Sequence, residues 1–321
     1  MTTLFAMLCS TGLLIGACAA DGRSPHAPTR AMGPVLPGRC ADPHVARVGT
    51  SYWIYPTTDG QQWMSTSFRA YRSDDLRTWT DEGVVLDLAE VSWAESRAWA
   101  PAMVEKDGRF YFYFTAEHRI GVAVGEGPGG PFRDALGEPL VEDGIWDTFE
   151  IDPYVFTDDD GRNYLYFGNG RCLAVELGDD MISFDHGAVR DVTPRDPTTE
   201  FREGVCVFRR GDVYHMTWSV NDTRSPDYQV HAATATSPFG PFEVAPNNPI
   251  LFRDGVSLGT AHHSVVQLAD EHGAPTDDWV IVFHRFAVPG GDGMNREVCL
   301  APLTFAPDGT IERVDLSALR E

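Results

Sequence analysis

Short runs of alternating apolar and polar residues recur along the chain, and turn residues join them in pairs. In one pair, residues 150–156 lead through the turn Asp158-Asp159-Asp160-Gly161 into a second aromatic run, Tyr164–Gly168. A period of two indicates half-buried strands, and glycine adopts the positive φ that a tight turn requires. This stretch therefore predicts a β-hairpin.

The chain repeats this hairpin pattern five times, and the starts step along by roughly 50 to 60 residues, close to the spacing of propeller blades. The expected strand pairs are 44–48 with 51–55, 103–106 with 110–114, 151–156 with 164–168, 205–210 with 213–218, and 264–268 with 279–284. More strand-like sequence follows each pair, whereas helical periodicity is confined to one short piece at 87–95. We predict an all-β protein, in which residues 38–321 form a five-bladed β-propeller with the active site at one mouth of the central channel.

The N-terminal residues have a different character. Residues 1–20 are predicted to be an export signal, because the apolar run 4–17 is shorter than a bilayer span and ends in Gly16-Ala17-Cys18, which resembles a bacterial lipobox. No Lys or Arg precedes the run. Residues 21–37 are rich in Pro, Gly and Ser and are expected to be a flexible tether. The sequence thus predicts an exported protein that is extracellular, periplasmic or anchored through a lipid on Cys18.

Charge narrows the classes of partner. The 321 residues carry 47 Asp and Glu against 25 Lys and Arg, a net charge of -22. A field of that sign repels phosphate backbones and anionic membranes, so we expect no nucleic-acid partner and no membrane contact other than the lipid anchor. A neutral substrate suits this surface. The Gly-rich residues 125–130 are not followed by a helix and are interpreted as a turn, so no organic cofactor is expected, and we predict a monomer.

Four cysteines lie beyond the predicted leader. They are Cys40, Cys172, Cys206 and Cys299, and they are scattered without a Cys-x-x-Cys pair. This spacing does not favour a zinc site. Buried free cysteines are the preferred interpretation, although a disulfide is not excluded by the sequence.

The residues just before the predicted inner strands carry the candidate chemistry. Asp42, Trp99, Asp152 and Glu203 precede their hairpin turns by similar distances. Because blades repeat around an axis, these side chains should meet at one mouth of the channel. Sugar hydrolysis needs one carboxylic acid to protonate the leaving oxygen and a carboxylate to activate water or to attack, and a third carboxylate raises the pKa of the acid. The tryptophan offers a flat apolar face to a sugar ring.

Each of these residues also has a plain structural interpretation. Asp-Pro pairs such as Asp42-Pro43 and Asp152-Pro153 are common at turns and strand entries, and Trp99 could be a core residue. Their shared position within the repeat favours catalysis for the two aspartates. Glu203 is the one glutamate in the same phase.

Taken together, the motifs resemble glycoside hydrolase family 43 over roughly residues 38–314. The motifs that carry the resemblance are Ala41-Asp42-Pro43, Trp99-Ala100-Pro101, Ile151-Asp152-Pro153, Arg202-Glu203-Gly204, residues 259–266 and Phe283-His284-Arg285. The resemblance implies a five-bladed propeller and an inverting mechanism. By the family pattern, Asp42 is the general base, Glu203 is the general acid, and Asp152 orients the acid and modulates its pKa.

The resemblance also implies three further roles. Arg285 and Arg296 look like the sugar-contacting arginines, and His262 looks like the histidine that coordinates a structural cation, often calcium, in the central channel. The alternatives are a structural ion pair for Arg285 and a hydrogen-bonded core histidine for His262. Two positions depart from the family pattern, since Val205 stands where Pro is usual and Ala102 where Asp is frequent.

The resemblance is strongest to exo-acting α-L-arabinofuranosidase and β-xylosidase members. We expect release of arabinofuranosyl residues from an oligo- or polysaccharide such as arabinan or arabinoxylan, because residues 283–285 and 291–299 look most like arabinofuranosidases. A β-xylosidase or a galactan-active enzyme would use the same three carboxylates. A retaining fructan hydrolase would need Asn in place of Ala41. A carbohydrate-binding propeller without turnover would not require three carboxylates in phase.

Overall fold

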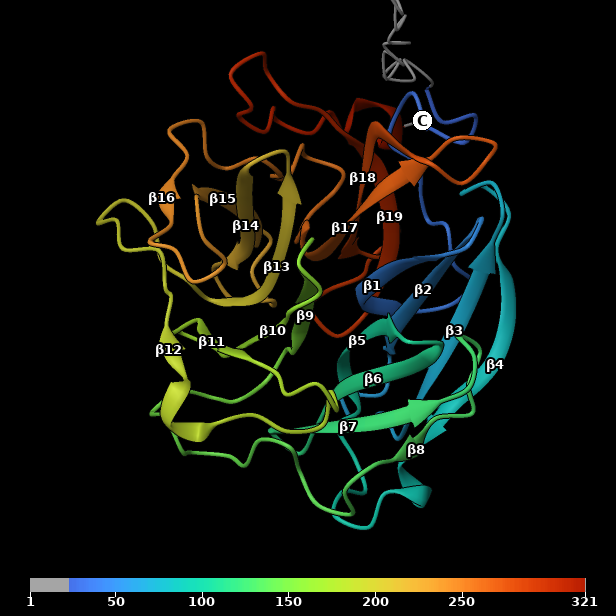
Figure 1. Ribbon diagram of the computed structural model, residues 1–321. Helices are drawn as coiled ribbons and strands as arrows, with labels where there is room; N and C mark the ends of the chain where they lie inside the picture. The colour runs from blue at the N-terminus through green and yellow to red at the C-terminus, as the bar shows by residue number, and fades with distance from the viewer. Residues whose placement is uncertain (1–22, 321) are drawn as a thin grey trace, which may run out of the picture.

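Five small antiparallel sheets stand around a central axis in the computed structural model, which describes residues 23–320 (Figure 1). Blade one holds β1 (Cys40–Val48), β2 (Ser51–Thr58), β3 (Ser67–Ser73) and β4 (Thr80–Asp87); blade two holds β5 (Trp99–Lys106), β6 (Arg109–Ala116), β7 (Arg119–Gly125) and β8 (Arg133–Asp134); blade three holds β9 (Tyr154–Thr157), β10 (Asn163–Phe167), β11 (Leu173–Glu176) and β12 (Arg190–Asp191); blade four holds β13 (Glu203–Arg210), β14 (Val213–Val220), β15 (Gln229–Ala235) and β16 (Glu243–Val244); blade five holds β17 (Ala261–Ala269), β18 (Pro275–Phe286) and β19 (Arg296–Leu303). The predicted all-β, five-bladed propeller is confirmed.

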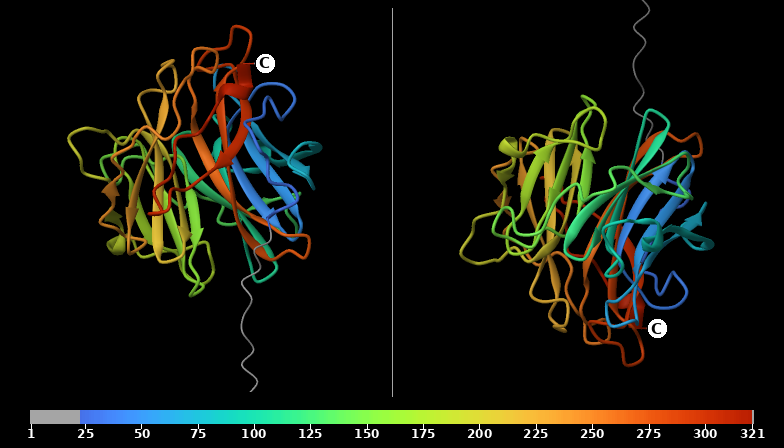
Figure 2. Two further views of the ribbon diagram at one scale, coloured as in Figure 1. Left: turned by 90° about the horizontal axis from the view of Figure 1, so that it is seen from above. Right: turned by 90° about the horizontal axis from the view of Figure 1, so that it is seen from below.

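Each predicted hairpin supplies the two inner strands of one blade. In blade one, β1 pairs with β2 around the Gly49-Thr50 turn, and the inner pairs of the other blades are antiparallel neighbours in the same way. Within each blade the strands follow one another in chain order from the axis outwards (Figure 1), and Figure 2 shows the same sheets from above and from below.

Helical structure is limited to three 3₁₀ turns in the described residues: Leu88–Glu90, His186–Ala188 and Ser317–Arg320. The helical piece expected at 87–95 is reduced to the first of these, which Asp87 caps by accepting a hydrogen bond from the Ala89 amide. No helix within residues 23–320 is long and apolar enough to cross a membrane.

The core lies between neighbouring sheets, where aromatic side chains from adjacent blades interlock. Between blades one and two, Phe112 stacks on Phe132 with centroids 4.8 Å apart and meets Phe68 edge-on at 5.3 Å. All three rings are buried. Ring contacts of this kind add to the burial of large apolar areas, so the blades form one rigid frame for the channel mouth.

The prediction that residues 21–37 form a flexible tether is wrong for most of those residues that the structure describes. Met32 forms an antiparallel bridge with Leu300, and the Val35 amide donates to the Val298 carbonyl. Leu36 is buried. The segment thus covers the outer edge of blade five, which has three strands of its own. The Pro- and Gly-rich composition concealed a few apolar residues that suffice to dock it.

The remaining expectations for the N-terminus and the cysteines have different outcomes. The export signal predicted for residues 1–20, with its lipid site at Cys18, lies outside the described residues. The other four cysteines, Cys40, Cys172, Cys206 and Cys299, are buried and free, as predicted.

Candidate active site

In every blade, a residue within two positions of the start of the innermost strand lies in the left-handed backbone region. These residues are Asp42 (φ 46°), Ala100 (φ 38°), Asp152 (φ 58°), Gly204 (φ 63°) and His262 (φ 34°). In blades one, two, four and five the register of the inner pair shifts at this point, as in a β-bulge. Bulges re-aim side chains at sheet edges, and here they turn the start of each inner strand towards the channel mouth.

Four of these five backbone amides donate to a side chain on the second strand of the preceding blade. The pairs are Ala100 with Thr57 Oγ1 (2.8 Å), Asp152 with Thr115 Oγ1 (3.0 Å), His262 with Ser219 Oγ (3.0 Å) and Asp42 with His284 Nδ1 (3.1 Å). The last pair joins blade five to blade one. Four of the five blades therefore fix the strained residue of the next blade, which helps to hold the candidate catalytic side chains in register around the axis.

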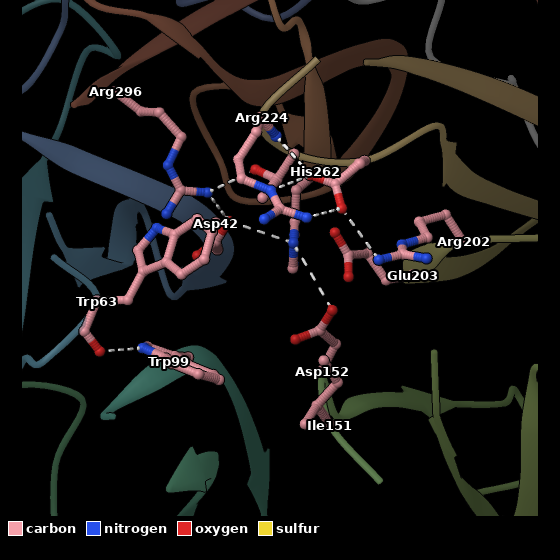
Figure 3. A pocket seen from close by; sticks show the side chains of 12 residues that line it. Asp42, Trp63, Trp99, Ile151, Asp152, Arg202, Glu203, Arg224, His262 and Arg296 are labelled. Carbon is pink, nitrogen blue, oxygen red and sulfur yellow. Dashed lines mark hydrogen bonds and ion pairs between the residues drawn. The ribbon is translucent and has the colours of Figure 1, made fainter. Parts of the chain in front are cut away.

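One pocket of about 210 Å³ gathers the predicted residues (Figure 3). It is lined by Asp42, Asp152, Glu203, Trp99, Arg296 and His262, and also by Trp63, Ile151, Arg202, Asp222, Thr223 and Arg224. The first six were predicted from the sequence. All five blades contribute to the pocket, so side chains distant in sequence meet as the repeat implied.

Asp42 is a buried carboxylate with positive charge beside it. Its Oδ1 accepts a 2.9 Å hydrogen bond from Arg296 and lies 3.3 Å from His262 Nδ1 and 3.2 Å from His284 Nδ1. Burial alone would raise the pKa of Asp42, but the Arg296 guanidinium and then the two imidazoles hold this pKa well below its ordinary value. Asp42 is therefore ionised at neutral pH.

The pKa values of Asp152 and Glu203 are shifted in the opposite direction, upwards. Burial, and then repulsion from Glu203 and Asp42, raises the pKa of Asp152 well above its usual range. Burial also raises the pKa of Glu203, against the hydrogen bond from Tyr228 and the nearby Arg202. One pocket thus holds a carboxyl group whose pKa is lowered and two carboxyl groups whose pKa values are raised, the kind of separation that acid–base pairs need.

Two residues that the sequence did not single out orient the Glu203 side chain. The Tyr228 hydroxyl donates to Oε1 at 2.8 Å, and Asn169 Nδ2 donates to Oε2. Tyr228 lies just before β15 and Asn169 just after β10, outside the repeated motif that marked the inner strands. No periodic signal distinguished them from other loop residues.

Two tryptophans form the wall opposite Glu203 (Figure 3). Trp99 Nε1 donates to the Trp63 carbonyl at 2.8 Å, and Trp63 Nε1 donates to the Gly293 carbonyl at 3.1 Å. Both indoles are half-buried and line the pocket. Trp99 therefore occupies the predicted place for a sugar platform, and Trp63, which the sequence analysis missed, extends it from the loop after β2.

Arg296 and Arg285 have different surroundings. Arg296 reaches the pocket and connects Asp42 with Asp59, whose carboxylate receives the Arg296 Nε–H at 2.9 Å and has no exposed side-chain area. Arg285 does not line the pocket: it is 4% exposed and pairs with Glu297 at 2.9 Å. The expected sugar contact by Arg285 is therefore not made from its position in the structure, and the structural ion pair describes it instead.

The calcium ion that the resemblance implied for the central channel stays a prediction. Below the pocket, the channel narrows to a cavity of about 10 Å³ near His262, room for roughly one water molecule. Calcium takes six to eight oxygen ligands, whereas no group of three or more His, Cys, Asp or Glu within residues 23–320 is arranged to hold a metal. Burial lowers the pKa of His262 to about 4, so this imidazole is neutral beside Asp42.

Comparison with known proteins gives a consistent set of similarities. The profile of the family described as "Glycosyl hydrolases family 43" matches residues 32–311. The chain is 34% identical to the β-D-galactofuranosidase xynD of Aspergillus niger, over 90% of this chain and 86% of that protein. It is 28% identical to xylosidase/arabinosidase 43A of Humicola insolens, over 84% of this chain and 95% of the other. A solved GH43_1 enzyme from Xanthomonas citri superposes with a TM-score of 0.75 at 28% identity, covering 88% of this chain and 93% of that chain.

Proposed function

Because the chain belongs to glycosyl hydrolase family 43 and is a glycosidase of that family, we propose that it is an exo-acting, inverting enzyme that releases terminal arabinofuranosyl residues. The observation that carries the proposal is the opposite displacement of two pKa values in one pocket. The pKa of Asp42 is held low and that of Glu203 is raised. A carboxylate and a carboxylic acid that flank one sugar are the requirement for acid–base hydrolysis of a glycosidic bond.

Each carboxyl group has one role in the proposed reaction. Asp42, ionised and fixed by Arg296, accepts a proton from the water that attacks the anomeric carbon. Glu203 donates its proton to the glycosidic oxygen as the bond to the leaving group breaks. Asp152 lines the same pocket, where burial and then Glu203 and Asp42 raise its own pKa, and in the proposed reaction it orients the acid and modulates its pKa. Water, rather than a side chain, attacks, so the anomeric configuration inverts.

The size of the pocket supports removal of one terminal sugar at a time. Its volume of about 210 Å³ is below the range of about 300–1,000 Å³ of pockets that enclose larger ligands. Trp63 and Trp99 close one side, and the floor carries the charged groups. A single sugar residue fits such a space, whereas an internal stretch of polysaccharide would need a groove open at both ends.

Relatives support a pentose or furanose substrate. Several similar proteins carry names that combine xylosidase with arabinosidase, and others are arabinoxylan arabinofuranohydrolases. A second candidate is a galactofuranosyl residue, which the 34% identity to a β-D-galactofuranosidase favours. Arabinofuranose and galactofuranose share a five-membered ring, and galactofuranose carries a longer exocyclic chain. The two candidates therefore differ in how much space is needed beside that ring.

A panel of nitrophenyl glycosides tests the proposal. We expect the α-L-arabinofuranoside to be hydrolysed with the highest kcat/KM of a set that also holds the β-D-galactofuranoside, the β-D-xyloside and the β-D-galactopyranoside. Glu203→Gln should lower kcat by about 10²–10⁴-fold, as expected for loss of a general acid. Preference for the galactofuranoside would select the second candidate. Absence of turnover for every member, with sugar binding retained, would favour a binding protein instead.

A further inference from the structure

Phe149 is the most exposed of the large apolar side chains in the described residues. Its side chain is 56% exposed, although it stands directly before the buried Glu150 and the pocket residues Ile151 and Asp152. Exposing an aromatic ring to water costs free energy that most positions avoid. Beside a sugar pocket, such a ring offers the flat apolar surface on which the C–H face of a sugar stacks.

Phe149 ends a row of rings that starts inside the pocket. The centroids of Trp99 and His118 are 5.5 Å apart, and those of His118 and Phe149 are 5.8 Å apart. Trp99 lines the pocket, His118 is half-buried, and Phe149 is exposed. The row thus runs from two half-buried rings in blade two to an exposed ring in the loop before blade three.

The turn that presents His118 is fixed and strained. Glu117 and His118 occupy the β6–β7 turn with φ values of 50° and 65°, a conformation for which glycine or asparagine is usual. The Glu117 carboxylate accepts hydrogen bonds from the Glu95 amide and the Ser96 hydroxyl, which ties the turn to the loop between β4 and β5. Non-glycine residues held in such a conformation are frequent at ligand sites.

The loop that carries Phe149 is also tied down. Glu150 is fully buried, and its carboxylate accepts hydrogen bonds from the Gly144 amide at 2.8 Å and the Trp146 amide at 2.9 Å. The ring therefore projects from a fixed backbone rather than from a free loop. A preformed surface of this kind loses little entropy when a ligand binds.

The outer end of the row, at Phe149, is linked to the segment that holds the acid. Phe149 forms a backbone bridge with Asn169, and Asn169 Nδ2 donates to the Glu203 carboxylate. In the proposed reaction Glu203 protonates the oxygen of the leaving group. The part of the substrate that departs therefore begins close to the segment that carries Phe149.

We propose that His118 and Phe149 form leaving-group subsites that continue from Trp99 and bind the next sugar units of an oligosaccharide or polysaccharide. The inference rests on the proposed function and adds the substrate class to it: an extended, uncharged sugar chain rather than a short glycoside. The ring of His118 lies between those of Trp99 and Phe149 and completes the surface that they form. Its pKa is lowered by burial and then by Arg97, so the imidazole is neutral at pH 7.

The test compares a long and a short substrate. For wild type and Phe149→Ala, kcat/KM is measured with α-1,5-arabinotriose and with nitrophenyl α-L-arabinofuranoside. We expect the ratio of the first value to the second to fall about five- to tenfold in Phe149→Ala, mainly through KM, since one stacking contact is lost. Val213→Ala is the matched control: Val213 is 38% exposed and stands at the β13–β14 turn, and its ratio should stay as in wild type.

A binding measurement separates failure of this inference from failure of the proposed function. In the Glu203→Gln background, calorimetry should show that Phe149→Ala weakens the Kd for arabinotriose about five- to tenfold, without any turnover. An unchanged Kd together with an unchanged ratio would overturn the inference while leaving the hydrolase intact. If Phe149→Ala weakens binding of the trisaccharide but the wild-type protein hydrolyses neither substrate, the sugar-binding surface is supported and the proposed hydrolase activity is refuted. Circular dichroism and thermal melting confirm that each variant is folded.

Discussion

Arg296 is the residue on which the ionisation of the proposed base depends. Its guanidinium lies between two buried carboxylates, at 2.9 Å from Asp42 and at 2.9 Å from Asp59. Asp59 has no exposed side-chain area, so it anchors the arginine rather than contacting a substrate. Burial raises the pKa of Asp42, and among the groups that lower this pKa Arg296 has the largest effect.

Arg296→Met should therefore shift the pH profile. Without the positive charge the pKa of Asp42 rises, so Asp42 becomes protonated at a higher pH and the acidic limb of kcat/KM moves upward, by about one pH unit or more. Arg285→Met is the matched control, because Arg285 is equally buried but pairs with Glu297 outside the pocket. The acidic limb of Arg285→Met should stay at the wild-type pH. If the acidic limb of Arg296→Met also stays there, Arg296 does not control the ionisation of Asp42.

A second prediction concerns the acid. The Tyr228 hydroxyl donates to Glu203 and favours the ionised form, so Tyr228→Phe should raise the pKa of Glu203 and move the basic limb of the profile to higher pH. We also expect kcat to fall about two- to tenfold, because the carboxyl group loses one of two orienting contacts. Tyr166→Phe, which removes a hydroxyl bonded to the Pro238 carbonyl, should change neither limb.

Residues were predictable where the blade repeat marked them. Asp42, Asp152 and Glu203 come from similar positions in repeats one, three and four, and the structure brings them to one pocket. Arg285 and Arg296 lie on neighbouring strands, β18 and β19, and motif likeness alone did not indicate which side chain faces the pocket. Asn169, Tyr228 and Trp63 contact the site from loops or strand edges, where no period exists to reveal them.

At the level of strands, the repeated bulge places the chemistry. Each inner strand has a residue with positive φ close to its start, and four of these five residues are not glycine. The strands were predictable because burial of one face of a sheet requires apolar and polar residues to alternate, and turn residues mark where the strands end. The bulges were not predictable, since only Gly204 among these positions is the glycine that usually marks positive φ, and the others hold Asp, Ala and His.

The hydroxyls that cap the bulges give a paired prediction. Thr115→Val leaves the buried Asp152 amide without its partner, and Thr57→Val does the same to Ala100; both should lower the free energy of unfolding by about 1–3 kcal/mol. Of the two threonines, only Thr115 holds the backbone of a candidate catalytic residue, Asp152. Denaturant unfolding should therefore give similar losses, whereas kcat should fall clearly more in Thr115→Val. Equal losses of kcat would show that the bulge does not position Asp152.

On the scale of the whole molecule, the ring depends on how its last blade is completed. Blade five has three strands, and residues 31–36 lie along β19 through the Met32–Leu300 bridge. The composition of this segment led to the wrong expectation of a tether. Composition describes the average of a stretch, whereas docking depends on a few buried positions such as Ala31 and Leu36.

Leu36→Ala tests whether this segment stabilises the propeller. Truncation of a buried leucine costs about 2–5 kcal/mol, so Tm should fall by several degrees, even though Leu36 lies outside the pocket. Thr29→Ala, at an exposed position of the same segment, should leave Tm unchanged. An unchanged Tm in Leu36→Ala would mean that the five blades are held together without the segment.

The central claim is that an ionised Asp42 activates water on one side of a sugar while Glu203 protonates the leaving oxygen on the other. Proton NMR during hydrolysis of an α-L-arabinofuranoside tests this most directly, because the first product to accumulate reveals the side of attack. The account predicts that β-L-arabinofuranose appears first and then mutarotates. Initial accumulation of the α anomer would mean that a side chain attacks in place of water, and would contradict the assignment of Asp42 as a base.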